Sequence, residues 1–353
     1  MRSSRVIGAA LIFGTASLAL TACDPPMPPE VAAQIAEQTY TCVEGESKVV
    51  VPGNMTDLLI GWADSLSYAC VDPEPVMTMV QGDDALTANA EVTEYAPLCE
   101  AVTSVPLAVD AGVVVFYQSE IASLNLSAES IQGILNGSIT NWNQLGSDNP
   151  GAEMPDFPLS ILPTADTQAL KSVNDYLKLK GLSSDNSVVS AVDHPSMEDY
   201  ALLEDGQMAI VPNSYAVALA LYPAAIYMGF NEEFQEPILA TPDVAGIQSA
   251  STQWLVSKDA NGVGVVLDAN KTPTAPEGSD FAPEPYQIIY PVNFTVCGTD
   301  SLVSRAAARF MLRLDSQGAL GASNYAPLPE PVRIEALLSI SKGLPTPKPT
   351  PTE

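Results

Sequence analysis

The sequence predicts an α/β fold with parallel sheets, and two observations lead to this class. Short apolar runs typical of buried strands alternate along the chain with segments in which apolar residues recur at helical spacing. The chain also has 353 residues, enough for two domains of common size with a sizeable core.

The expected elements follow one another in this alternation. The expected strands cover residues 48–51, 76–81, 105–109, 113–117, 158–162, 208–211 and 286–296. The expected helices cover residues 55–68, a segment that begins at Ser127, and residues 170–180 and 302–314. Residues 341–353 form a Pro/Thr-rich tail without core-forming side chains.

The stretch LSAESIQGILNGSITNWNQLG, residues 126–146, has the features of one helix with defined ends. Ser127 is a good N-cap, and Gly137 stands where a left-handed C-cap belongs. Ile131, Ile134 and Leu135 share one helical face. On spacing alone the segment predicts a surface helix followed by a buried Trp142.

The N-terminus reads as a secretory signal in residues 1–22. Arg2 and Arg5 precede an apolar run that ends in Leu-Thr-Ala-Cys, and this ending resembles a bacterial lipobox, in which Cys23 becomes the lipidated first residue. An ordinary signal peptide or a short transmembrane anchor is the alternative. We therefore expect an extracytoplasmic protein held to the cell membrane through lipid on Cys23.

The charge balance is strongly acidic. Removal of residues 1–22 leaves 12 basic against 42 acidic side chains. Nucleic acid is therefore not an expected partner, and contact with anionic lipid should go through the lipid anchor. A local pocket of donors can still bind an anionic ligand, because screening weakens the global field.

Four cysteines remain after Cys23, an even number that suits an oxidising compartment. Three pairings are possible, and we favour Cys42 with Cys70 and Cys99 with Cys297. The first pair would flank a strand and a helix, and the second would tie the early chain to its end. A metal site is the rival interpretation, but the chain has no CxxC spacing and a single histidine, so we expect no metal.

Catalytic motifs are missing from the sequence. No Gly-x-Ser-x-Gly, HExxH or P-loop pattern occurs, and His194 lies among polar neighbours typical of a surface loop. Trp62, Tyr68, Trp254 and Tyr290 are more typical of core or hinge positions than of a sugar-stacking set. We expect neither an enzyme nor a cofactor.

Two stretches resemble one known family. VPLAVDAGVVVFYQ followed by LNLSAESIQGILNGSITNWNQLG is similar to the second-domain entry of the bacterial extracytoplasmic phosphate-binding proteins of ABC transporters. NYAPLP, residues 324–329, resembles that family's C-terminal GYAPLP signature, and YPVNF with Asn293 matches an element near its second hinge strand. The resemblance spans most of residues 47–340.

The resemblance implies a two-lobed periplasmic-binding-protein-like fold of type II, with a mixed sheet flanked by helices in each lobe and two hinge crossovers. Residues 47–104 and 295–340 would form lobe 1, and residues 105–294 would form lobe 2. Residues 23–46 would serve as a tether.

The resemblance also implies a ligand site at strand-to-helix turns from both lobes. Mapped onto this chain, the family's binding turns fall on Met55, Thr56, Asp83, Asp84, Glu94, Thr164, Asp166, Thr167 and Gln168. Carboxylates replace hydroxyls at positions 83 and 84, and a threonine at position 164 replaces the family's arginine. An alternative for Asp83 or Asp84 is a built-in anion that caps the following helix, and another is a solvated loop tip.

These resemblances imply a monomeric, lipid-anchored substrate-binding protein that captures inorganic phosphate between its lobes for an ABC permease. The alternative is a diverged relative that has lost phosphate binding and acts as an envelope sensor or scaffold, or that binds another small ligand.

Overall fold

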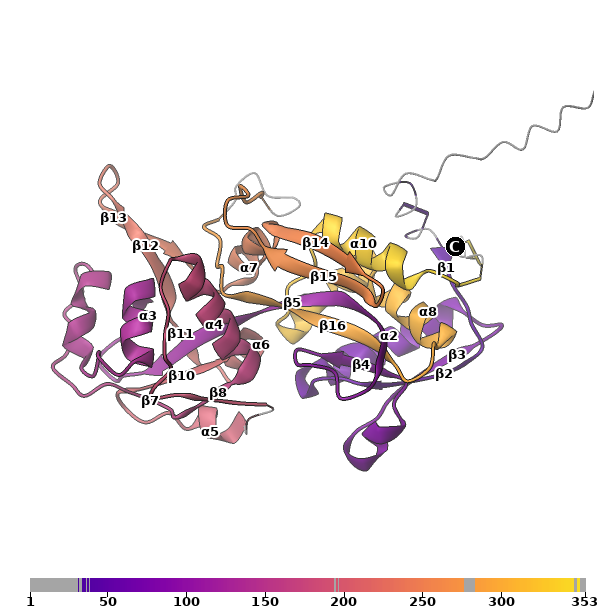
Figure 1. The fold of residues 1–353 in the computed structure, drawn as a ribbon, viewed down its shortest axis with the longest axis horizontal. Coiled ribbons are helices and arrows are strands. Elements are labelled where there is room, and N and C mark those ends of the chain that lie inside the picture. The colour runs from indigo at the N-terminus through magenta and orange to yellow at the C-terminus, as the bar shows by residue number, and fades with distance from the viewer. Residues whose placement is uncertain are drawn as a thin grey trace, which may run out of the picture.

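The computed structural model describes residues 39–193, 195, 197–275, 283–345 and 348–349, together with Val31, Gln34, Ile35 and Glu37. Cys23 and His194 lie outside these residues. Two lobes stand side by side, joined by the long strands β5 (Ala101–Tyr117) and β16 (Ile289–Cys297) that run between them (Figure 1). The two-lobed α/β architecture expected from the sequence is confirmed.

Lobe 1, on the right of Figure 1, surrounds the Ala101 end of β5. Its strands are β2 (Gly45–Val50), β3 (Pro75–Met79), β4 (Ala90–Thr93), β14 (Trp254–Asp259) and β15 (Gly262–Leu267). Its helices are η1 (Gly53–Met55), α2 (Thr56–Ala69), η2 (Gly82–Thr87), α8 (Leu302–Met311), α9 (Leu314–Gly318), η4 (Leu320–Ser323) and α10 (Glu330–Ile340). The short strands β1 (Thr39–Tyr40) and β17 (Lys348–Pro349) pair at its edge.

Lobe 2 surrounds the Tyr117 end of β5. Its strands are β6 (Asn125–Leu126), β7 (Ser160–Ile161), β8 (Thr164–Asp166), β9 (Ser190–Val192), β10 (Gln207–Pro212), β11 (Tyr222–Pro223), β12 (Ala225–Asn231) and β13 (Glu236–Ala240). Its helices are α3 (Ala128–Leu135), η3 (Trp142–Asp148), α4 (Thr167–Leu179), α5 (Met197–Ala201) and α6 (Asn213–Ala218), and α7 (Val244–Ser251) lies beside the hinge strands.

The main sheet is mixed, in the order β14-β15-β5-β16-β4-β2-β3, with β10 paired to the far half of β5. Strands β3, β2 and β4 are parallel, whereas β16 returns antiparallel along β5. The mixed sheet implied by the family resemblance is therefore confirmed, whereas the parallel sheets predicted from the alternation alone hold for β2, β3 and β4 but not for β16, because the chain crosses the hinge back in the opposite direction. The predicted lobe boundaries stay a prediction; the β14–β15 hairpin, which they assign to lobe 2, pairs with Ser104 of β5.

Strand β5 joins two runs that the sequence predicts as separate strands. Residues 105–116 are all buried, because β16 pairs with the first part of the strand and β10 with the second. Gly112 is required in the middle of the strand, since an added Cβ would lie 2.6 Å from the carbonyl oxygen of Ala169 on α4. The absence of a side chain thus lets α4 pack directly on β5.

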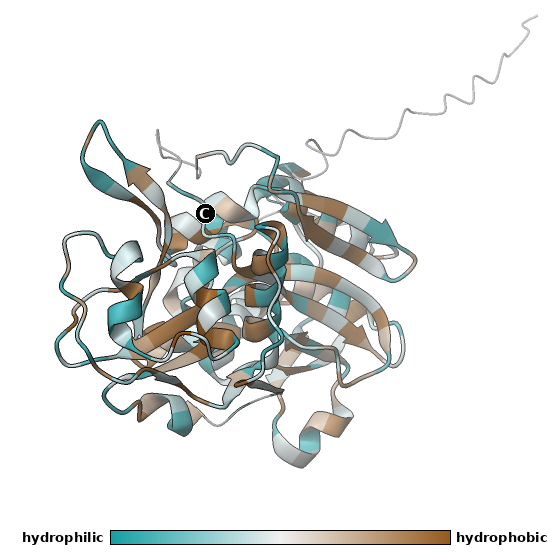
Figure 2. Ribbon diagram, turned by 60° about the vertical axis from the view of Figure 1, so that its left-hand side comes forward, coloured by the Kyte–Doolittle hydropathy of each residue, from teal (hydrophilic) through white to brown (hydrophobic). Residues whose placement is uncertain are grey.

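The predicted helix unit of residues 126–146 forms as expected. The Ser127 side chain accepts a hydrogen bond from the Ser130 amide at 3.1 Å, and Gly137 adopts φ 69° after the helix. Ile131, Ile134 and Leu135 are buried, and Trp142 is fully buried. Figure 2 shows the hydrophobic residues concentrated on the central strands of the molecule and hydrophilic ones on its protruding loops.

Both predicted disulfides are present. Cys42 is bonded to Cys70 at the end of α2, and Cys99 is bonded to Cys297 at the end of β16. The two cysteines of the first bond are 28 residues apart in the sequence, and those of the second are 198 residues apart. Among the described residues, no helix is long and apolar enough to cross a membrane.

Candidate functional site

Three carboxylates, Glu94, Asp110 and Asp166, come together where the two lobes meet, and Glu94 enters this cluster from lobe 1. Glu94 directly follows β4 and is buried. It accepts hydrogen bonds from the hydroxyls of Tyr290 at 3.2 Å and Tyr325 at 3.1 Å. The Tyr325 hydroxyl also lies 2.9 Å from the side-chain oxygen of Asn54 in η1. Glu94 is thus enclosed by donors from β16 and from the C-terminal signature.

The C-terminal signature NYAPLP places Tyr325 in this cluster. Asn324 adopts a left-handed conformation with φ 64°, at the position where the family motif has glycine. Ala326 then pairs with Val109 of β5. The turn therefore delivers Tyr325 to the side of Glu94.

Asp110 enters the cluster from the middle of β5 and is fully buried. One of its oxygens accepts from the amides of Ala111 at 2.7 Å and Ser214 at 3.1 Å. Its other oxygen accepts from the Ser214 hydroxyl at 2.6 Å. Burial is the main reason that the pKa of Asp110 rises to about 7, although these hydrogen bonds lower it.

Asp166 is the contribution of lobe 2. It caps α4, accepting from the amides of Gln168 at 2.9 Å and Ala169 at 2.8 Å. The hydroxyl of Tyr95, in lobe 1, donates to the second oxygen of Asp166. This hydrogen bond links the two lobes directly.

The electrostatics of the cluster are unfavourable to a further anion. Burial, and then the nearby charges of Asp110 and Asp166, raise the pKa of Glu94 well above its usual range. Burial likewise raises the pKa of Tyr290 and Tyr325, and the carboxylates reinforce the shift. In the described part of the chain, neither Glu94 nor Asp110 has a lysine or arginine within ion-pair distance.

The predicted ligand residues divide into two sets. Glu94 and Asp166 lie in the cluster, with Thr167 and Gln168 half-buried beside them at the start of α4. Three further positions lie elsewhere in these elements: Met55 is buried before α2, Thr56 is half-buried at the first turn of α2, and Thr164 is half-buried in β8.

The acidic pair after β3 lies in η2. Asp84 is exposed there, and the backbone of Asp83 lies beside it, whereas the side chain of Asp83 falls outside the described part of the chain. Of the alternatives open for Asp84, its exposure favours the solvated loop tip. The carboxyl groups buried between the lobes are instead those of Glu94, Asp110 and Asp166.

Sequence reasoning missed Asp110, Ser214 and the tyrosines of the cluster. Asp110 had a visible signal, since it is the one charged residue within the apolar run of residues 105–117. A buried charge in such a strand demands donors from elsewhere in the fold. Beyond the neighbouring Ala111 amide, the donors come from Ser214, 104 residues away, which spacing does not reveal.

One group of residues in the described chain has the composition of a metal site. Glu91, Cys99 and Cys297 place ligand atoms within 4.8 Å of one another. Both cysteines are joined in a disulfide, and Glu91 accepts a hydrogen bond from the amide of Leu98 at 3.0 Å. Both thiols are therefore consumed by the disulfide, and the Glu91 carboxylate is hydrogen-bonded to the backbone.

Solved structures share the fold across most of the chain. An ancestral soluble variant of the human phosphate-binding protein matches with a TM-score of 0.55 at 12% identity, covering 82% of this chain and 92% of its own. The fold is that of a type II periplasmic binding protein. A human phosphate-binding apolipoprotein matches with a TM-score of 0.53 at 12% identity, covering 81% and 92% of the two chains.

A high-affinity periplasmic phosphate-binding protein, PfluDING, solved with phosphate bound, matches with a TM-score of 0.50 at 12% identity, covering 86% of this chain and all of its own. No family profile and no curated protein sequence matches the chain. The resemblance to phosphate-binding proteins is thus confirmed for the fold, and these structural neighbours are binding proteins rather than enzymes.

Proposed function

We propose that this protein is a lipid-anchored extracytoplasmic scaffold with a phosphate-binding-protein fold, whose interlobe cleft is filled by its own side chains and does not capture free phosphate. The observation that carries the proposal is the burial of Glu94 and Asp110 with hydroxyl and amide donors turned toward them. Donors of this kind would face the ligand in an anion site, and here they face carboxylates.

The magnitude of the repulsion supports the loss of phosphate binding. Two unit charges about 4 Å apart interact by roughly 4 kcal/mol at an effective dielectric near 20. One ionised carboxylate at that distance from a phosphate oxygen would weaken binding by about a thousandfold. The cluster contains three carboxyl groups, and the raised pKa values of Glu94 and Asp110 make the repulsion strongest at alkaline pH. Position 164 has threonine where the family has a bidentate arginine.

The membrane location is supported by the signal-like N-terminus and by the two disulfides. Disulfides persist in oxidising compartments outside the cytoplasm. Replacing Cys23 with alanine should release the protein into the medium or leave it as an unprocessed precursor. A processed variant that remains in the membrane fraction would argue against a lipid anchor.

Phosphate capture for an ABC permease is the competing function, and the fold shared with phosphate-bound PfluDING favours it. The two functions differ in one measurable quantity, the affinity for phosphate. A periplasmic scavenger needs tight binding, whereas a cleft closed on its own carboxylates should bind weakly or not at all.

Calorimetric titration with inorganic phosphate at pH 8 and low salt tests the proposal. The natural protein should show no saturable binding tighter than about 1 mM. The matched variant, with Glu94→Gln and Asp110→Asn, should bind at least as well, because it removes two groups that can carry negative charge and retains polar side chains. Micromolar or tighter binding by the natural protein would overturn the scaffold function.

A further inference from the structure

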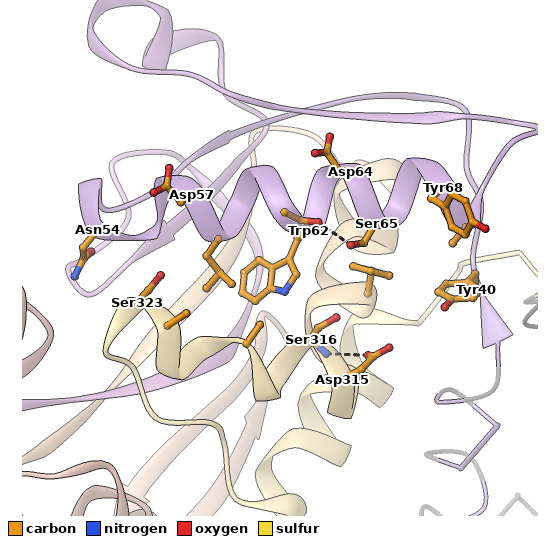
Figure 3. Close-up of a pocket in the computed structure, with 16 residues that line it drawn as sticks. Tyr40, Asn54, Asp57, Trp62, Asp64, Ser65, Tyr68, Asp315, Ser316 and Ser323 are labelled. Carbon is orange, nitrogen blue, oxygen red and sulfur yellow. Dashed lines mark hydrogen bonds between the residues drawn. The ribbon is translucent and has the colours of Figure 1, made fainter.

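A groove runs along the outer face of lobe 1, between α2 and the α9–η4 segment. Its volume is about 1400 Å³. The wall formed by α2 extends from Asn54 to Ala69, and the facing wall includes Ser316, Ala319 and Ser323 (Figure 3). Tyr40 and Tyr68 stand together at the end of α2.

The lining of the groove combines aromatic rings with acidic side chains. Tyr40, Trp62, Tyr68 and Phe310 contribute the rings, and Tyr68 is 85% exposed. Asp57, Asp64 and Asp315 contribute carboxylates, and the lining contains no lysine, arginine or histidine. A large exposed aromatic side chain beside acidic groups is a feature of recognition surfaces.

Two of the three acids have no cation of their own. Asp315 pairs with Arg313, whereas Asp57 and Asp64, exposed on the rim formed by α2, take part in none of the ion pairs of the described chain. The rim therefore presents negative charge that an approaching cationic side chain can neutralise.

The floor of the groove contains an unused donor. The Trp62 side chain is 5% exposed, and its indole nitrogen is buried without a hydrogen-bond partner. Figure 3 shows this nitrogen directed toward the segment that holds Ser316. Buried polar groups without a partner are rare in folded proteins.

The length of the groove suits an extended segment. At 1.5 Å per residue, the wall from Asn54 to Ala69 is about 22 Å long. A polyproline II segment of about seven residues spans the same length at 3.1 Å per residue.

We propose that this groove is a docking site for an extended, proline-rich segment of a partner protein that carries lysine or arginine. Proline-rich segments dock in aromatic-lined grooves because their extended conformation is already formed and little entropy is lost. The basic side chains would pair with Asp57 and Asp64, and the prolines would pack on Tyr68, since the ring of Tyr40 is already stacked with Phe310 and covered by Arg313. This proposal goes beyond the proposed scaffold function, because it specifies the chemical class of the partner that the protein would bind.

The test uses the peptide Pro-Pro-Lys-Pro-Pro-Arg-Pro-Pro-Lys, labelled with a fluorophore, and the mature full chain. Fluorescence anisotropy at low salt should show saturable binding, and the peptide with glutamate at every basic position should not bind. Tyr68→Ser and Asp64→Lys should each weaken binding at least about fivefold, since each removes one contact worth about 1 kcal/mol.

Matched controls replace residues of the same type on lobe 2. Tyr222→Ser removes an exposed tyrosine, and Glu232→Lys reverses an exposed acid, so both should leave affinity within about twofold. Thermal unfolding of each variant verifies that it is folded.

Three outcomes would overturn the proposal. The peptide fails to bind at millimolar concentration, or it binds the two groove variants as well as the natural chain. In the third, the full chain does not bind but a variant ending at Gly343 does, which would identify the occupant as the chain's own Pro/Thr tail rather than a partner.

Discussion

The interlobe cluster and the α2 groove use similar residue types in opposite ways. In the cluster, tyrosine hydroxyls and carboxylates satisfy one another, and Glu94 and Asp110 are buried. In the groove, Tyr68, Asp57 and Asp64 face solvent, and the indole nitrogen of Trp62 has no partner. The polar groups of the cluster are hydrogen-bonded to one another, whereas Tyr68, Asp57 and Asp64 of the groove remain exposed.

This difference teaches where to look for a ligand in a protein of this fold. In a protein of this fold, the surface that recognises a partner can lie outside the cleft between the lobes. Substitutions in the cluster should change stability, whereas substitutions in the groove should change binding and leave stability almost untouched. The predictions below, from the largest effect to the smallest, can sharpen or break this distinction.

Removing the two disulfides should have the largest effect on stability. Cys99–Cys297 lies at the end of β16, and Cys42–Cys70 lies at the end of α2. Cys99→Ala with Cys297→Ala opens the 198-residue loop, and should lower the free energy of unfolding by about 5 kcal/mol. Cys42→Ala with Cys70→Ala opens a 28-residue loop at the end of α2, and should cost about 3.5 kcal/mol. Denaturant unfolding of the two variants measures both costs, and a reversed order would contradict the loop-closure argument.

Asp110 should make the protein less stable as pH rises. Its folded pKa of about 7 lies above the unfolded value of 3.8, so the folded state binds the proton more tightly. This contribution is fully present below about pH 4 and is lost as pH rises through about 7. The raised pKa of Glu94 acts in the same direction.

Asp110→Asn should therefore flatten the decline in unfolding free energy between pH 4 and pH 8 by roughly 2–4 kcal/mol. The asparagine can keep the contacts of the carboxylate, because its oxygen accepts from the two amides and its NH₂ can donate to the Ser214 hydroxyl. Urea unfolding across this pH range provides the measurement. An unchanged slope would show that Asp110 does not titrate in this window.

Tyr95→Phe should have a smaller effect on stability, about 1–3 kcal/mol, because it removes a hydrogen bond to a carboxylate at the lobe contact. The matched groove variant Tyr68→Phe should change stability by less than about 0.5 kcal/mol, since that side chain is 85% exposed. Thermal unfolding compares the two. Equal losses of stability in the two variants would contradict the distinction between the interlobe cluster and the α2 groove.

Much of the fold could be predicted from the sequence because local signals agree with it. Ser127 and Gly137 bound their helix as predicted, and both disulfides join the favoured pairs. The direction of β16 could not be predicted from periodicity, since apolar runs look alike in parallel and antiparallel pairs.

The site was predicted less well. Glu94 and Asp166 were found through the family motif, but Asp84 turned out to be exposed, and Asp110 and Ser214 were missed. A family motif identifies the residues of one turn in the sequence. The cluster instead depends on contacts between residues that are distant in sequence, such as Glu94 and Tyr325, which are 231 residues apart. The groove was likewise invisible, because its two walls come from opposite ends of the chain.

The distance between the lobes tests most directly whether the cleft is held closed by its own side chains. Spin labels at Leu86→Cys and Leu202→Cys, positions that are 92% and 76% exposed on lobe 1 and lobe 2, report this distance by pulsed electron paramagnetic resonance. We predict one narrow distribution that is the same without and with millimolar phosphate. A broad distribution that narrows and shortens when phosphate is added would contradict the account, because it would show that a ligand, rather than the Tyr95–Asp166 contact, closes the cleft.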